Sequence, residues 1–335
     1  MTNASARLAD PPPLDGAALL RRLPSMRGKL IPMAPLAPYT WLRVGGPAEV
    51  LFSPADREDL IAFLMTTPAD VPITPIGVGS NLIVRDGGVP GVVIRLGAAF
   101  GAIEAEGAEL TAGAAALDAR VAEAAAAAGI AGLEFLRGVP GAIGGALTMN
   151  AGAYGRYLAD VLVAAEAVDR EGRRLMLSLE EMGFAYRSSA PKDLIYIGAR
   201  LQGRADAPEA IRARMAALMA QRAESQPVKD RTAGSTFRNP AGYSSTGAAD
   251  DPMEMKAWAL IERAGCRGLR RGDAVMSEKH ANFLTNAGKA TAADLEGLGE
   301  EVRRRVLEET GVRLEWEVAR IGLPASEQGG EEARA

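Results

Sequence analysis

The sequence predicts a mixed α+β fold that contains at least two domains. Three observations support this prediction. From residue 40 onwards, short apolar runs alternate with helical stretches, glycine-rich turns separate many of these runs, and no segment repeats along the chain. With 335 residues, the chain is also long enough to bury a sizeable core in each of two or three domains.

The first half of the chain begins with a segment interrupted by prolines, which we interpret as an N-terminal extension over residues 1–35 with a short helix at 14–23. A helix is expected at 55–65, where Ser53-Pro54 marks its start. A second helix is expected at 118–128, where Gly129 ends it. Strands are expected at the short apolar runs 48–52, 73–76, 82–84, 92–96, 161–169 and 194–201.

A domain boundary is predicted near 203–208, where the pattern changes to long helices. The segment 226–252 looks irregular, 314–321 resembles a final strand, and the polar tail, taken from 323 and most evident from 326, is expected to be disordered. Helices are expected at 209–224, 254–264 and 292–309, the last of them ended by Gly311.

Composition excludes several classes of protein. The 38 basic and 42 acidic residues give a net charge of −4, and aromatic residues make up only 5%, so a nucleic-acid partner is not expected. The single cysteine, Cys266, and the single histidine, His280, argue against a disulfide and against a metal site. Neither a signal peptide nor an apolar run of membrane-spanning length is recognisable, so a cytoplasmic location is expected, with no membrane partner.

The glycine-rich run at 137–155 is the most informative segment of the sequence. It holds six glycines, and no charge follows Arg137 within it. A flexible linker is one interpretation, but linkers favour serine and polar residues, whereas apolar residues are interleaved here. We therefore favour a loop whose backbone closely approaches a phosphate or a planar ring.

Two further glycine loops lie earlier in the chain. The first, at 77–82, reads Gly-Val-Gly-Ser-Asn-Leu between two predicted strands, and a plain tight turn is its alternative interpretation. The second, at 40–47, places Arg43 beside Gly45 and Gly46, and its alternative is a domain-entry turn. Three such loops together favour an extended cofactor that bears phosphate.

Four polar side chains are candidates for chemistry. Arg187 could stabilise negative charge or be a surface arginine, and Ser235 could donate a proton or cap a helix. His280 precedes a predicted strand and could be catalytic or structural. Glu317 could handle a proton or lie on a solvated strand face.

These motifs together resemble the UDP-N-acetylenolpyruvoylglucosamine reductase family (MurB) over about residues 36–322. The matching segments occur in the family's order: 40–47, 77–81, 138–155, 186–188, 233–240, 279–282 and 314–322. The resemblance implies a flavin-binding fold of the vanillyl-alcohol-oxidase (PCMH) type over 36–205, in two subdomains that divide near residue 97. It implies a C-terminal α/β substrate domain over 206–322. The chain looks like the shorter, type II form of the family.

The resemblance also implies an activity and a set of functional residues. NADPH would reduce non-covalently bound FAD, and the flavin would then reduce UDP-N-acetylglucosamine enolpyruvate to UDP-N-acetylmuramate for peptidoglycan synthesis. Ser235 would donate the proton, while Arg187 and Glu317 would polarise the substrate carboxylate. Substrate contacts are implied for Tyr186, Arg222, Asn239, Arg267 and His280. Cofactor contacts are implied for Arg43, Gly45, Gly46, Gly77, Val78, Gly79, Ser80, Asn81, Leu82, Gly138, Val139, Pro140, Gly141, Ile143, Gly144, Gly145, Ala151 and Gly152.

Two other functions remain open at this point. One is a flavin-dependent oxidase of the same fold superfamily that acts on an alcohol or sugar, although His280 and Cys266 lie outside the half of the chain proposed to bind FAD. The other is a non-catalytic sugar-nucleotide binding protein, which would not need Arg187, Ser235 and Glu317 together. The acidic stretch at 243–255 departs from the compact form of this segment in the family.

Overall fold

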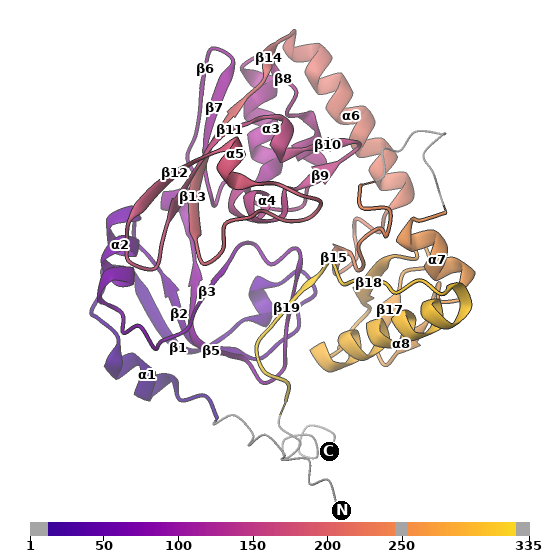
Figure 1. Ribbon diagram of the computed structural model, residues 1–335, viewed down its shortest axis with the longest axis horizontal. Helices are drawn as coiled ribbons and strands as arrows, with labels where there is room; N and C mark the ends of the chain where they lie inside the picture. The colour runs from indigo at the N-terminus through magenta and orange to yellow at the C-terminus, as the bar shows by residue number, and fades with distance from the viewer. Residues whose placement is uncertain (1–12, 245–253, 326–335) are drawn as a thin grey trace, which may run out of the picture.

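The computed structural model describes residues 13–244 and 254–325 of the chain. Sheets of four, five and four strands, each with its own helices, form three bodies that meet near the middle of the molecule (Figure 1). Short two-stranded pairings and 3₁₀ turns connect them. This arrangement of sheets and helices confirms the predicted α+β class.

The first body is a four-stranded sheet with two helices. Its elements are α1 (Gly16–Arg22), β1 (Lys29–Pro35), β2 (Pro47–Ser53), α2 (Arg57–Thr66), β3 (Ile73–Ile76) and β5 (Val89–Arg95). The strand order is β1–β2–β5–β3, in which only the β1–β2 pairing is antiparallel. Asp56 caps α2 by accepting a hydrogen bond from the Asp59 amide at 2.9 Å, and Phe63 of α2 packs on Phe52 of β2 with ring centroids 4.2 Å apart.

Part of the segment interpreted as an N-terminal extension belongs to this sheet. Strand β1 pairs with β2 from Lys29 to Pro35, although Pro32 and Pro35 suggested irregular structure. Proline is tolerated in β1 because this is an edge strand. An edge strand has a hydrogen-bonded neighbour on one side only, so the missing N–H of proline removes few hydrogen bonds from the sheet. The prediction of an extension is therefore wrong for residues 29–35, and also for α1, whose Leu19 is buried in the core of this body. Residues 1–12 lie outside the described residues.

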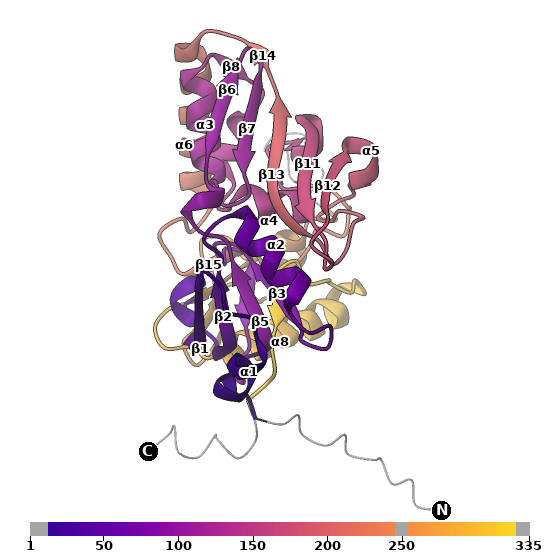
Figure 2. The same cartoon turned by 90° about the vertical axis from the view of Figure 1, so that its left-hand side faces the viewer.

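The second body is a five-stranded antiparallel sheet in the order β12–β11–β13–β7–β6, with helices α3 and α6 standing on one side of it (Figure 2). Alanines of α3 are buried against this sheet, so the helix approaches it closely. The elements of this body are β6 (Ile103–Glu106), β7 (Glu109–Gly113), α3 (Asp118–Ala127), β8 (Ile130–Ala131), α4 (Ile143–Met149), β9 (Gly152–Ala153), β10 (Arg156–Tyr157), β11 (Leu162–Val168), β12 (Arg174–Ser178), α5 (Leu179–Met182), β13 (Ile195–Gln202), β14 (Arg204–Ala205) and α6 (Pro208–Ser225).

Helix α6 was assigned by sequence to the C-terminal domain, but it packs on the second body. Its buried residues Ile211 and Met215 belong to the same apolar core as Val121 of α3. The change from strands to long helices near residue 205 therefore marks the end of the sheet of the second body, but the core of this body continues into α6. The third body begins after this helix.

The glycine-rich run contains a helix that sequence did not predict. Helix α4 occupies Ile143–Met149, and it buries Ile143, Ala146 and Leu147, which lie three and four residues apart. This spacing gives one apolar helical face, and Asn150 ends the helix in a left-handed conformation with φ of 41°. The apolar residues are spaced as in a helix, but the many glycines between them made this helix hard to predict from the sequence.

The third body is a small sheet covered by two helices. Its elements are β15 (Thr232–Ser235), α7 (Ala257–Arg263), β16 (Arg270–Arg271), β17 (Ala274–Met276), β18 (Phe283–Asn286) and α8 (Ala292–Thr310). The strand order is β15–β18–β17–β16, and α8 buries Leu295, Leu298 and Val302 in the shared core. Strand β15 lies in the segment expected to be irregular. No helix in the described parts of the chain is long and apolar enough to cross a membrane.

The chain ends by returning to the first body. Strand β19 (Ala319–Ile321) pairs in parallel with β4 (Leu82–Val84), so only the end of the predicted strand at 314–321 is regular. Before it, Trp316 forms an isolated bridge with Phe237, and the two rings lie 5.0 Å apart. Short 3₁₀ helices complete the fold at η1 (Ala37–Tyr39), η2 (Ala98–Phe100), η3 (Glu134–Gly138) and η4 (Leu158–Asp160).

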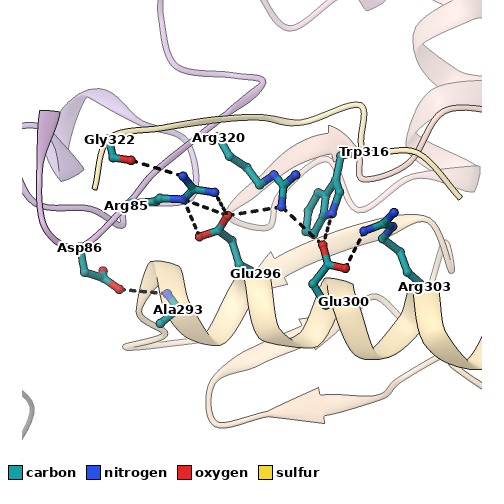
Figure 3. Close-up of polar contacts among 9 residues, drawn as sticks. All are labelled: Arg85, Asp86, Ala293, Glu296, Glu300, Arg303, Trp316, Arg320 and Gly322. Carbon is teal, nitrogen blue, oxygen red and sulfur yellow. Dashed lines mark hydrogen bonds and ion pairs between the residues drawn. The ribbon is translucent and has the colours of Figure 1, made fainter. Parts of the chain in front are cut away.

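Charged side chains fasten α8 to the loop that follows β4 (Figure 3). The Asp86 carboxylate accepts hydrogen bonds from the Ala292 and Ala293 amides at the first turn of α8, at 3.0 and 2.9 Å. Arg85 donates to the Glu296 carboxylate through Nε and through its terminal nitrogen at 3.0 Å. We call this group of contacts, made by Arg85 and Asp86 with α8, the α8 latch.

Candidate active site

A cavity of ~640 Å³ lies where the three bodies meet, and its size is typical of a ligand site. The first body contributes residues 75–82 and 94–98, and the second contributes residues 114–118 and much of 138–153. The third body contributes residues 233–235 and Phe283, and Glu317 comes from the segment that leads back to β19. The cavity wall is therefore made of segments that are far apart in the sequence.

Two of the three predicted glycine loops form one side of this cavity. Glycines 77, 97 and 145 line it without a positive φ, and a Cβ built on any of them would meet nothing within 4 Å. The packing of the protein thus does not require glycine at these places, which is what we expect where a ligand approaches the backbone closely. The predicted cofactor residues that line the cavity are Gly77, Val78, Gly79, Ser80, Asn81, Leu82, Gly138, Val139, Pro140, Gly141, Gly144, Gly145, Ala151 and Gly152.

The third glycine loop does not line the cavity. Gly45 has a φ of 115°, and a Cβ there would lie 2.5 Å from Val84, while a Cβ on Gly46 would lie 2.3 Å from the Asp86 carbonyl oxygen. The Arg43 guanidinium donates to the Pro38 carbonyl. These residues build a tight corner beside β4, and Ile143 is buried in the core of the second body. The prediction that Arg43, Gly45, Gly46 and Ile143 line the ligand site is therefore not supported. The two glycines were misleading because close packing within a protein requires glycine just as close approach by a ligand does.

A buried ion pair lies at the other side of the cavity. Arg187 Nε donates to Glu317 Oε1 at 2.7 Å, and a terminal nitrogen of Arg187 donates to the Gly152 carbonyl at 3.2 Å. The two side chains are only 15% and 10% exposed. Arg187 adopts a left-handed backbone with φ of 56°, a strained conformation of the kind that recurs at functional sites.

Glu317 is held in place through its backbone. Its amide donates to the Thr236 carbonyl at 2.8 Å, and its own carbonyl accepts a hydrogen bond from Asn81 Nδ2 at 3.1 Å. These bonds bring the glycine loop of the first body next to the segment that carries Ser235, which also lines the cavity. Burial raises the pKa of Glu317, against the opposing effect of Arg187.

Of the predicted substrate residues, Arg222 lines the cavity. It donates to the Gly138 carbonyl at 2.7 Å, and burial lowers the pKa of its guanidinium. Tyr186 lies behind Arg187, with the guanidinium 5.3 Å from its ring centroid, and burial raises its pKa to about 12. The Asn239 amide donates to the Tyr186 hydroxyl at 3.4 Å.

Arg267 and His280 lie within the third body and do not line the cavity. Arg267 pairs with Glu262 at 2.8 Å and donates to the Glu278 carbonyl. His280 packs against Phe283 with ring centroids 4.7 Å apart, and burial together with Arg267 lowers its pKa to about 4. The structure thus joins Arg187, Ser235, Glu317 and Arg222 around one cavity, and it leaves Arg267 and His280 outside.

Several cavity residues were missed by the sequence analysis, and Asp118 is the one with unusual chemistry. Asp118, the first residue of α3, lines the cavity, is fully buried, and has neither carboxyl oxygen in a hydrogen bond. An aspartate at a helix start ordinarily indicates an interaction with the helix dipole, which is why the sequence did not distinguish it.

The fold and the glycine-lined cavity define an FAD-binding protein. Residues 48–178 match the family described as an FAD binding domain, and this stretch holds most of the glycine side of the cavity. Residues 226–321, which supply Ser235 and Glu317, match the UDP-N-acetylenolpyruvoylglucosamine reductase C-terminal domain. The fold expected from the sequence is confirmed in both of its parts.

Comparison with whole proteins identifies the family. A UDP-N-acetylenolpyruvoylglucosamine reductase from Parvibaculum lavamentivorans is 58% identical over 315 residues, which cover 94% of this chain and 97% of that protein. One from Azorhizobium caulinodans is 57% identical over 92% of this chain and 96% of its own length. The crystal structure of the Thermus caldophilus enzyme superposes with a TM-score of 0.74 at 37% identity, covering 89% of this chain and all of that one. The chain belongs to the UDP-N-acetylenolpyruvoylglucosamine reductase family, and it is an FAD-dependent oxidoreductase.

Proposed function

We propose that the chain reduces UDP-N-acetylglucosamine enolpyruvate to UDP-N-acetylmuramate with NADPH. One observation carries this proposal: the buried Arg187–Glu317 pair and Ser235 line the same cavity as two glycine loops of the FAD-binding domain. A sugar-nucleotide binding protein would not need that charged pair beside a cofactor site. The chain's single histidine and single cysteine do not line the cavity, so we propose non-covalent FAD and disfavour a covalent flavin oxidase.

The glycine side of the cavity suits FAD. We assign the cofactor to the loops at 77–82 and 138–145, where Gly77 and Gly145 leave space open to a ligand. FAD held by these loops would supply hydride transfer between NADPH and the enolpyruvyl group. Arg222 donates to the Gly138 carbonyl, and we infer that it fixes this loop while its charge faces a ligand anion.

The opposite side of the cavity suits the chemistry of the substrate. Hydride addition beside a carboxylate creates negative charge, which the preorganised Arg187 guanidinium would offset. Glu317 fixes the direction of that guanidinium through the 2.7 Å bond. Ser235 is assigned as the proton donor to the substrate carbon, where it acts as a general acid. Tyr186 and Asn239, which lie behind Arg187, are assigned to support the substrate end.

The domain division follows from the same assignment. We propose an FAD-binding part in two subdomains up to residue 205 and a substrate part that ends at 322, with α6 packed on the former. Only family resemblance implies substrate contacts for Arg267 and His280, and because neither residue lines the cavity, we assign neither of them a role in binding. A cytoplasmic location, a role in peptidoglycan synthesis and the lack of a nucleic-acid partner also remain proposals.

An anaerobic visible spectrum tests the function directly. The purified protein should be yellow, should bleach with NADPH, and should regain its colour when UDP-N-acetylglucosamine enolpyruvate is added. A yellow protein that does not respond to this substrate would contradict the proposed reaction and favour the oxidase. A colourless protein that FAD cannot reconstitute would contradict the assignment of the cavity.

A further inference from the structure

Two buried aspartates of this protein differ in their hydrogen bonding. Asp59 in α2 is 3% exposed, and its carboxylate accepts from the amides of Arg27, Gly28 and Ala55 at 3.0, 2.9 and 3.0 Å. Asp118 is 0% exposed, and both of its carboxyl oxygens lack a hydrogen-bond partner. Asp59 is therefore a satisfied structural group, whereas Asp118 is an orphaned one.

An orphaned carboxyl is unusual in a folded protein. Buried polar groups are almost always hydrogen-bonded, and an exception calls for a specific explanation, such as a missing ligand. Removing a carboxyl from water without a partner costs about 1–3 kcal/mol, which the fold must offset elsewhere. Burial also raises the pKa of Asp118 well above its usual range, which favours a neutral group that both donates and accepts.

The side chain of Asp118 does not hold the glycine loop in place. The backbone does this, since the Asp118 amide donates to the Gly141 carbonyl at 3.1 Å and Leu117 bridges to Ala142. The loop instead makes room for the carboxyl. A Cβ on Gly141 would lie 2.7 Å from Asp118 Oδ2, so glycine at this position leaves space for the Asp118 carboxyl.

The position of Asp118 points to the cofactor. Asp118 lines the cavity beside Val139, Pro140 and Gly141, which form part of the loop assigned above to FAD. We propose that Asp118 binds FAD as a neutral carboxyl, donating one hydrogen bond and accepting another from an uncharged part of the flavin. A ribityl hydroxyl and the imide edge of the ring both present a donor and an acceptor together. This inference rests on the proposed placement of FAD in the cavity.

The test compares FAD affinity with the stability of the apoprotein. FAD is removed, its dissociation constant is measured by fluorescence quenching, and thermal unfolding of the apoprotein is followed separately. Asp118→Ala should weaken FAD binding about tenfold, since a pair of hydrogen bonds is lost. The apoprotein midpoint should stay level or rise, because the orphaned carboxyl is gone. Asp118→Asn keeps one donor and one acceptor, so FAD should bind within about threefold of the wild type.

Asp59→Ala is the matched control. It removes a buried carboxylate with three partners, so the apoprotein midpoint should fall while the affinity of the folded protein for FAD stays the same. The proposal is overturned if Asp118→Ala binds FAD as the wild type does, or if its apoprotein loses stability as Asp59→Ala does. Wild-type apoprotein that does not bind FAD would instead refute the proposed function.

The absorption spectrum then separates the two parts of the flavin. A shifted visible maximum in FAD-bound Asp118→Asn assigns the contact to the imide edge of the ring. An unshifted maximum, together with the weaker binding of Asp118→Ala, assigns it to an uncharged part of FAD away from the ring, such as a ribityl hydroxyl. Either result is compatible with the proposal, which depends on weaker FAD binding by Asp118→Ala with an apoprotein that keeps its stability.

Discussion

The two sides of the cavity are built in different ways. On the glycine side, the wall is mainly backbone, and glycines 77, 97 and 145 leave open space where a side chain would project. On the charged side, Arg187 and Glu317 are paired with each other, and Glu317 is further tied to the chain through Thr236 and Asn81. This contrast agrees with the proposal that the glycine side binds the cofactor and that the charged side holds groups for chemistry. Substitutions on the two sides should therefore affect different steps.

The largest expected effect is on the charged side. Ser235→Ala should lower the rate of product formation by about 10³-fold, since a general acid contributes in the range of 10²–10⁴. Reduction of the flavin by NADPH should continue at the wild-type rate, because that step needs no proton from Ser235. Stopped-flow measurement of the two half-reactions checks this, and normal turnover would show that Ser235 is not the acid.

Glu317→Gln should slow the same half-reaction by about 10²-fold. The amide keeps the size of the side chain but loses the charge that holds the Arg187 guanidinium at 2.7 Å. Rates of flavin reduction and reoxidation are measured separately. If the rates of flavin reduction and of flavin reoxidation fell equally, the Arg187–Glu317 pair would support the folding of the site and not the reaction of the substrate.

Gly145→Ala should weaken FAD binding about tenfold without harming the apoprotein. A Cβ at this position meets no protein atom within 4 Å, so it would project into space that the cofactor needs. The apoprotein should gain about 0.5–1 kcal/mol, because alanine is the better helix former in α4. Titration with FAD and thermal unfolding of the apoprotein measure the two effects.

Gly144→Ala serves as the neighbouring control. A Cβ there would lie 3.2 Å from the Ala114 side chain, which is tighter than ordinary contact. The apoprotein should therefore lose stability, unlike that of Gly145→Ala. If both variants lost stability alike, the distinction between ligand-facing and protein-facing glycines in this loop would fail.

The difference between the two sides also explains what the sequence could predict. The glycine loops at 77–82 and 138–145 were recognisable because glycine patterns are local, but Gly45 and Gly46 gave the same pattern for internal packing. Arg187 and Glu317 are 130 residues apart, so only resemblance to a family placed both of them in one site, and their pairing with each other was not predicted. The orphaned state of Asp118 depends on what surrounds it, and no local pattern carries that information.

The same reasoning applies to the fold. Most helices and buried strands were predicted from periodicity, including α3, α8 and β13, which have regular apolar patterns. Strand β1 was missed because its prolines are tolerated only at a sheet edge, which is a property of the assembled sheet. Helix α6 was predicted but assigned to the wrong body, since its partners are set by tertiary packing.

His280 lies on neither side of the cavity, and it should affect stability more than binding. Its folded pKa of about 4 is below the ordinary value of 6.5, so the neutral form is favoured by folding. The stabilisation is complete above pH 6.5 and is lost as the pH falls towards 4, by about 2–3 kcal/mol. His280→Gln should flatten this part of the stability profile, measured by urea unfolding. A large rise in KM for the sugar nucleotide would instead place His280 at the substrate.

The smallest expected effect lies outside the cavity, in the α8 latch. Arg85→Ala removes the bonds to Glu296 that join the first and third bodies, at a site where both side chains are partly exposed (Figure 3). The free energy of unfolding should fall by about 1 kcal/mol, since exposed ion pairs contribute little. Because the third body carries Ser235, the substrate half-reaction should slow more than flavin reduction. Arg304→Ala, which removes pairs confined to α8 itself, is the control that leaves the junction intact. Equal kinetic effects of the two substitutions would show that the latch does not position the charged side of the cavity.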